Sequence, residues 1–105
     1  MPVGFPSDFP IYPGARLTKA GKVVYKASSS WLMEWQTYDP FVGVETYFIG
    51  TLDAGDWVLI QFPGSVDNQF AAEFRRASTA KVTGSMGVVV RDGVTKISVE
   101  LTTRS

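Results

Sequence analysis

Residues 86–101 read MGVVVRDGVTKISVEL, and this stretch decides the fold class. Runs of β-branched residues flank Asp92-Gly93, a dipeptide that suits a two-residue hairpin turn because both positions tolerate positive φ. Apolar and polar residues alternate after the turn, so one face collects Ile97, Val99 and Leu101 and the other collects Lys96, Ser98 and Glu100. The stretch predicts an antiparallel hairpin with one face in the core and the other in water.

The chain opens with a proline-rich segment, residues 1–14, which predicts an extended arm because each proline fixes its own φ and disfavours a helix before it. Apolar residues predict that this arm lies on the core: Phe5, Phe9, Ile11 and Tyr12. A pair of strands is expected next, over residues 22–27 and 31–38, because both runs are rich in β formers. The serines at 28–30 are expected to join them.

Asp39-Pro40 opens the predicted helix, with Asp39 as N-cap and Pro40 at the first helical position. Apolar residues recur at steps of three and four, which predicts a single buried stripe of Phe41, Val44, Phe48 and Leu52. Gly55 suits the far end of the helix. Gly43 and Gly50 share a helix face, and two interpretations are open. The glycines allow either close packing of the helix on a sheet or contact with a ligand or a second copy of the chain.

Strands are expected again after the helix. Residues 56–62 are apolar nearly throughout, as in a central strand, and Pro63-Gly64 would end it. Residues 70–76 alternate between apolar and polar, and a polar loop is expected over 77–85. The order arm-β-β-α-β-β-β-β predicts an α+β fold, a two-layer sandwich of one helix packed on an antiparallel sheet of five to six strands.

The composition excludes most catalytic chemistry. The chain of 105 residues contains no histidine and no cysteine, so it has no Ser-His-Asp triad, no Cys-His pair and no ligand set for zinc, copper or iron–sulfur centres. Its carboxylates are scattered and lack the spacing of a calcium loop, so neither a metal nor another cofactor is predicted. We therefore expect a protein that is not an enzyme; an enzyme that uses carboxylates and tyrosines only is the less favoured alternative.

The length fits a single domain, residues 1–105, made of the arm (1–14) and the α+β sandwich (15–105). Ten basic and ten acidic residues give zero net charge, which argues against nucleic acid as a partner. We interpret the basic cluster as a solvated sheet face: Arg75, Arg76, Lys81 and Arg91. No apolar run reaches the length of a membrane span, and the first residues do not resemble a signal peptide.

Two local patterns resemble a family of small bacterial envelope domains, many of them lipoproteins. Phe9-Pro10-Ile11-Tyr12-Pro13-Gly14-Ala15 is similar to the P-x-Y-P-G-A opening of this family. Its helix segment, with Asp-Pro, Val, Phe-Tyr, Leu and Gly-Trp in order, is matched by Asp39-Pro40, Val44, Tyr47-Phe48, Leu52 and Gly55-Asp56-Trp57, where Asp56 is an insertion. The resemblance covers residues 5–62. It implies an extracytoplasmic or membrane-anchored location, with a cytoplasmic one as the alternative, and supplies no active site.

Aromatic residues are the candidates for ligand binding. Trp31 and Trp35 fall on one strand face and could floor a groove, although filling the core beneath the helix is the favoured interpretation. Tyr12 and Tyr47 could donate hydrogen bonds at a pocket rim. We expect a binding or interaction domain for a protein, a peptide or a small apolar ligand, lipids included. The alternative is an assembly module that forms a homodimer through a sheet edge or through the face of Gly43 and Gly50.

Overall fold

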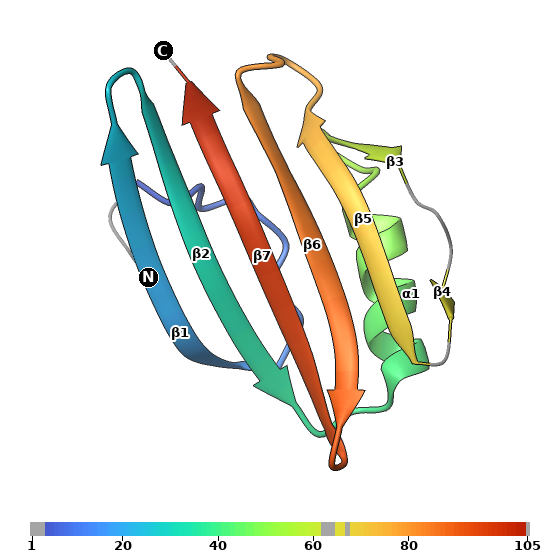
Figure 1. The fold of residues 1–105 in the computed structure, drawn as a ribbon. Helices are drawn as coiled ribbons and strands as arrows, with labels where there is room; N and C mark the ends of the chain where they lie inside the picture. Colours follow the sequence, from blue (N-terminus) through green and yellow to red (C-terminus); the bar gives the residue numbers. More distant parts are fainter. Residues whose placement is uncertain (1–3, 62–64, 67, 105) are drawn as a thin grey trace.

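The computed structural model describes residues 4–61, 65–66 and 68–104. The elements are β1 (Arg16–Tyr25), β2 (Ser28–Thr37), α1 (Phe41–Thr51), β3 (Trp57–Gln61), β4 (Ser65–Val66), β5 (Gln69–Arg76), β6 (Val82–Arg91) and β7 (Val94–Arg104). The strands form an antiparallel sheet in the order β1-β2-β7-β6-β5-β3, with the short β4 beside β5 (Figure 1). One helix on an antiparallel sheet was predicted, and the predicted order of elements is confirmed.

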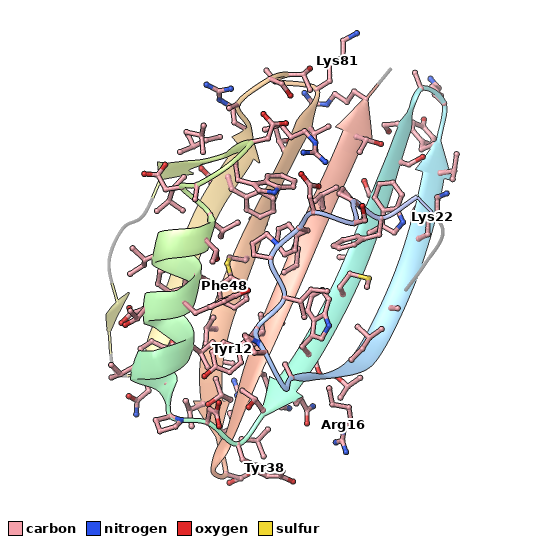
Figure 2. The ribbon with its side chains drawn as sticks, turned by 180° about the vertical axis from the view of Figure 1, so that it is seen from behind. Tyr12, Arg16, Lys22, Tyr38, Phe48 and Lys81 are labelled. Atoms are coloured by element: carbon pink, nitrogen blue, oxygen red, sulfur yellow. The ribbon has the colours of Figure 1, made fainter. Side chains whose placement is uncertain are left out.

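The helix and the N-terminal arm lie on the same face of the sheet (Figure 2). The helix lies over the side of β5 and β6, and the arm crosses β7 and β2 beside it. Between them and the sheet is the core, to which the helix contributes Phe41, Val44, Phe48 and Leu52, as its apolar stripe predicted. No described element covers the opposite face of the sheet, which we call the open face.

The alternation that predicted the closing hairpin is confirmed. Ile97, Val99 and Leu101 are almost fully buried, and each pairs in register with a buried residue of β2. The turn between β6 and β7 is Asp92-Gly93, with φ of 53° and 76° respectively, as a type I′ turn requires. The arm also contributes to the core through Phe5 and Phe9, as predicted, and Tyr12 packs against it, whereas Ile11 is exposed.

The first hairpin turns earlier than predicted. Its turn is Lys26-Ala27, with Lys26 at a φ of 52°, and residues 28–30 lie inside β2 rather than in the loop. These serines pair with β1 on one side and β7 on the other, and the Ser30 hydroxyl lies 2.9 Å from that of Thr102. Pairing on both sides therefore outweighs the weak strand propensity of serine.

The predicted N-cap is wrong. Pro40 occupies the cap position with extended backbone, and no side chain caps the helix. The Asp39 carboxylate instead accepts a hydrogen bond of 2.7 Å from the Tyr12 hydroxyl, so it is used by the arm. The helix ends with the Leu52 N–H donating to the Phe48 carbonyl, and Gly55 lies beyond this end, at a φ of 61°. No helix in the described part of the chain is long and apolar enough to cross a membrane.

The strand after the helix is an edge strand, not the predicted central one. β3 pairs with β5 alone, and Ile60 is exposed. The apolar character of β3 instead reflects Trp57, which is buried against the arm. Within the strand, the Leu59 N–H donates a hydrogen bond to the side chain of Asp53. The predicted strand end at Pro63-Gly64 lies outside the described residues.

Gly84 and Gly87 in β6 should respond differently to alanine. A Cβ at Gly84 would overlap the Phe74 ring and the Glu100 carbonyl oxygen, whereas at Gly87 the nearest atom is the Phe70 carbonyl oxygen at 3.7 Å. We expect Gly84→Ala to lower the free energy of unfolding by about 1–3 kcal/mol, because overpacking forces backbone shifts. Gly87→Ala should change it by less than about 0.5 kcal/mol. Urea denaturation followed by circular dichroism measures both, and equal effects would contradict this packing.

Candidate functional site

Both tryptophans that were predicted to bind a ligand lie in the core. Trp31 is 3% and Trp35 is 4% exposed, and the Phe5 ring of the arm lies against both, with centroid distances of 6.2 and 6.3 Å. The arm, rather than the helix, therefore covers these indoles. A ligand would reach them only after displacing the arm, and their role in binding remains a prediction.

Tyr12 and Tyr47 lie together and fasten the arm to the helix. Their rings meet edge to face at 5.3 Å, and their hydroxyls donate to the Asp39 carboxylate at 2.7 Å and to the Ile11 carbonyl at 2.8 Å. The hydrogen bond to Asp39 raises the pKa of Tyr12, and burial raises the pKa of Tyr47. Both hydroxyls thus stay protonated as donors at neutral pH, and each already has an acceptor within the chain.

The helix glycines face away from the sheet. The nearest atom to a Cβ built at Gly43 is the Tyr12 hydroxyl oxygen at 3.6 Å, and nothing lies within 4 Å of one built at Gly50. Close packing on the sheet therefore does not explain these glycines. Contact with a ligand or with a second copy remains a prediction.

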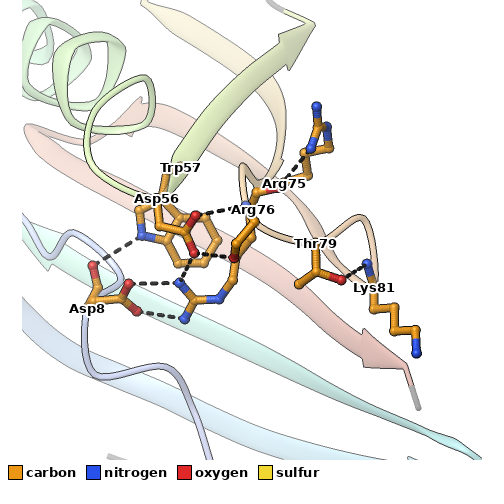
Figure 3. A network of polar contacts seen from close by, with 8 residues as sticks. Asp8, Asp56, Trp57, Arg75, Arg76, Thr79 and Lys81 are labelled. Atoms are coloured by element: carbon orange, nitrogen blue, oxygen red, sulfur yellow. Dashed lines mark hydrogen bonds and ion pairs between the residues drawn. The ribbon is translucent and has the colours of Figure 1, made fainter.

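The strongest polar network holds the arm to the ends of β3 and β5 (Figure 3). The Arg76 guanidinium donates to both carboxylate oxygens of Asp8 at 2.8 Å and to Asp56 at 3.2 Å, and it lies 4.5 Å from the centroid of the Trp57 ring. We call these four residues the Arg76 clasp. One member of the predicted solvated basic cluster is therefore a structural residue with a side chain only 19% exposed.

The clasp stays ionised at neutral pH. The hydrogen bond from Arg76 lowers the pKa of Asp8. Hydrogen bonds from the Ser78 hydroxyl at 2.7 Å and its N–H at 2.8 Å, together with Arg76, lower the pKa of Asp56. The two carboxylates in turn raise the pKa of Arg76. None of its ionisable residues is poised to exchange a proton near neutral pH, so the clasp provides no general acid or base. It holds the arm over the core.

The open face of the sheet contains a hollow of about 680 Å³. We call it the sheet hollow; its open-face lining is Lys19, Leu32, Glu34, Ala71, Glu73, Ser85, Gly87, Ser98 and Glu100. Small residues make its floor, because Ser98 pairs with Gly87 and Gly87 pairs with Ala71 across three neighbouring strands. The open face of a sheet usually carries long polar side chains, whereas here small residues at the same level of three strands leave the backbone uncovered.

Two glutamates face each other across the floor of the sheet hollow. Glu100 and Glu73 both pair in register with Ser85, which places their Cα atoms about 10 Å apart on either side of β6. Neither glutamate forms an ion pair with a residue in the described part of the chain. A smaller hollow of about 310 Å³ adjoins this point, shares these three residues and continues to Ile60 on β3.

Glu34 differs from the other two glutamates because its charge is already compensated. Its carboxylate accepts hydrogen bonds from Thr18 at 3.0 Å and from Gln36 at 3.2 Å. The bond from Gln36 contributes most to lowering the pKa of Glu34, and the charges of Lys19 and Lys96 add to the effect. The uncompensated charge of the hollow is therefore carried by Glu73 and Glu100. No three potential metal ligands come together among the described residues.

The sequence contains a signal for the sheet hollow that composition and motifs do not reveal. Ala71, Gly87 and Ser98 each occupy a polar-face position of an alternating strand, where a small residue covers little backbone. Their alignment, however, depends on the register of β5, β6 and β7.

Comparison of the chain with models of known families, with curated proteins and with solved structures finds no match. The resemblance to bacterial envelope domains therefore remains a prediction from local patterns.

The clasp should make the thermal stability of the protein depend on pH in the acid range. The folded-state pKa of Asp8 lies below its ordinary value of about 3.9. The stabilisation of the fold by the ionised Asp8 carboxylate is therefore fully present above about pH 3.9 and is lost as the pH falls through the folded-state pKa. We expect the melting temperature to fall below about pH 4, and to fall less steeply in Asp8→Asn. Asp92→Asn, a change in an exposed turn, is the control. Identical acid profiles for Asp8→Asn and the parent would contradict the role of the clasp.

Proposed function

We propose that this chain is a non-enzymatic binding domain whose sheet hollow receives a segment of a partner protein or a peptide. The observation that carries the proposal is the floor of small residues on three adjacent strands, bordered by Glu73 and Glu100 without cationic partners. An accessible concave surface with a few fixed polar groups is the usual form of a recognition site. The hollow is wide and open, which suits a peptide segment better than an enclosed small molecule.

The charge of the hollow favours a partner segment with basic residues. A lysine or arginine placed over Ser85 would lie between Glu73 and Glu100, and both carboxylates would attract it. Leu32, 53% exposed at the rim, offers apolar contact to a neighbouring side chain of the same segment. A segment that alternates basic and apolar residues therefore fits the site best.

The other predicted modes of binding have less support. A small apolar ligand between helix and sheet would have to displace Val44, Phe48 or Leu52, which are almost fully buried. Catalysis by carboxylates requires a raised pKa for an acid that works near neutral pH, and the pKa of Glu34 is lowered. The proposed extracytoplasmic location is supported by the local resemblance to envelope domains, and the absence of cysteine is compatible with it.

Filling the sheet hollow should abolish binding. We expect ¹⁵N-labelled protein titrated with a peptide of alternating lysine and valine to shift the amide signals of Ala71, Gly87 and Ser98, and an alternating glutamate–valine peptide to leave them in place. Gly87→Leu should weaken binding of the basic peptide more than tenfold, because its side chain occupies the floor.

The same substitution at Gly50, on the helix side of the molecule and in open space, is the matched control and should leave affinity unchanged. Shifts that spread over the helix, or equal affinity for Gly87→Leu and the parent, would refute the hollow as the binding surface.

Homodimeric assembly is the second candidate function, and a specific observation keeps it open. β1 is an edge strand of ten residues, exposed along nearly its whole length, and free edges pair readily with other strands. A symmetric β1–β1 contact would, however, bring Arg16, Lys19 and Lys22 of two copies together without an acidic residue on the strand.

We therefore expect the protein to be a monomer at micromolar concentration in analytical ultracentrifugation. A dimer would revive the assembly function, and two variants would then locate its interface. Lys19→Pro would disrupt a contact through the β1 edge, whereas Gly50→Lys would disrupt one through the glycine face of the helix.

A further inference from the structure

Zero net charge conceals an uneven charge distribution. The β1–β2 turn, the end of β7 and the β5–β6 loop lie at the same end of the sheet (Figure 1). Each contributes an exposed basic residue there, namely Lys26, Arg104 and Lys81. Backbone contacts fix their proximity, because the Arg104 N–H donates to the Lys81 carbonyl at 2.9 Å and Arg104 pairs in register with Ser28, just after the turn.

The same end exposes three consecutive apolar residues. Val23 is 57% exposed, and Val24 and Tyr25 are each 66% exposed. The described part of the arm begins at Gly4 and does not cover them: Gly4 lies against Trp31 and Lys22, which pair in register, and β1 continues beyond that level. Because side chains alternate along a strand, the three residues are exposed on both faces of the hairpin.

Two described carboxylates near this end, Asp8 and Asp56, both bind Arg76. These three residues together carry one net negative charge, which offsets only part of the three positive charges of Lys26, Lys81 and Arg104. We call Val23, Val24, Tyr25, Lys26, Lys81 and Arg104 the basic tip. It combines exposed apolar side chains with a surplus of positive charge at one end of a molecule that is 39 Å long.

We propose that the basic tip docks on the surface of an anionic lipid bilayer. Aliphatic and aromatic side chains of a projecting hairpin can enter the boundary between headgroups and acyl chains, while flanking lysine and arginine contact the phosphates. Nucleic acid would account for the cations but not for the adjacent valines, and a small anion would need neither the valines nor a convex tip. The bilayer is the partner whose chemistry matches both halves of the surface.

This docking leaves the proposed binding surface accessible. The strands run along the molecule towards the tip, so a protein standing on its tip would present the sheet hollow sideways, away from the lipid (Figure 1). The two proposals rest on different residues, and either can fail without the other.

Vesicle sedimentation tests the proposal with the full chain. We expect the protein to sediment with vesicles of phosphatidylcholine containing about one third phosphatidylglycerol, to remain soluble with phosphatidylcholine alone, and to dissociate as salt rises. The charge variant Lys26→Glu/Lys81→Glu should weaken binding at least about tenfold, since each cation near such a surface contributes about fivefold. The apolar variant Val23→Thr/Val24→Thr/Tyr25→Thr should also lose binding, while its threonines preserve strand propensity.

The matched control removes equally exposed apolar side chains elsewhere. Tyr38 is 82% exposed and lies at the opposite end of the sheet, and Val42 is 67% exposed on the helix (Figure 2). Tyr38→Thr/Val42→Thr should bind vesicles as the parent does. Circular dichroism melts confirm that each variant is folded before it is compared.

The absence of cysteine allows a direct test of orientation. A polarity-sensitive fluorophore on Tyr25→Cys should shift to the blue when anionic vesicles are added, and the same fluorophore on Tyr38→Cys should not. Equal shifts at both positions, or no sedimentation of the parent at low salt, would overturn the proposal. Binding that survives the threonine variant and is matched by short DNA would also overturn it, in favour of a general polyanion site.

Discussion

The structure depends on one geometric constraint: a single helix of eleven residues cannot cover this sheet. Six strands about 4.8 Å apart span about 24 Å, whereas a helix with its side chains covers about 10 Å of that width. The remainder of the apolar face needs a second cover, and the proline-rich arm supplies it. Phe5 meets Trp31 and Trp35, and Phe9 fits between Trp57 and Phe74.

That constraint determines what the aromatic residues do. From Gly4 onward the arm forms no helix or strand of its own, so its backbone gains little from regular pairing and its position depends on side chains. Ring contacts hold its middle, the Tyr12 and Tyr47 hydroxyls fasten it to the helix, and the Arg76 clasp fastens it to β3 and β5. The residues that most resembled a binding site are therefore engaged in closing the core, and the surfaces that we propose for binding lie elsewhere.

Local patterns predicted the fold well where each element is determined by its own sequence. The Asp92-Gly93 turn, the alternation of β7 and the stripe of α1 need no distant partner to be recognised. The errors occurred where distant residues decide. Asp39 does not cap the helix: the cap position falls on Pro40, and the Asp39 carboxylate accepts a hydrogen bond from Tyr12, far away in the chain. β3 looked central because it is apolar, but the arm rather than a second neighbouring strand buries Trp57.

The same distinction explains why neither of the two proposed binding surfaces was predicted. Lys26, Lys81 and Arg104 are far apart in the sequence, and only the sheet order β1-β2-β7-β6-β5 brings three strand ends together. Ala71, Gly87 and Ser98 are unremarkable singly and form a floor only through the register of three strands. The composition gives only the total charge, and a net charge of zero is compatible with a cationic tip and an acidic hollow on one molecule. In a fold whose arm and helix use one face entirely for the core, the proposed binding surfaces lie on the open face and at the strand ends. Their chemistry follows from register rather than from composition.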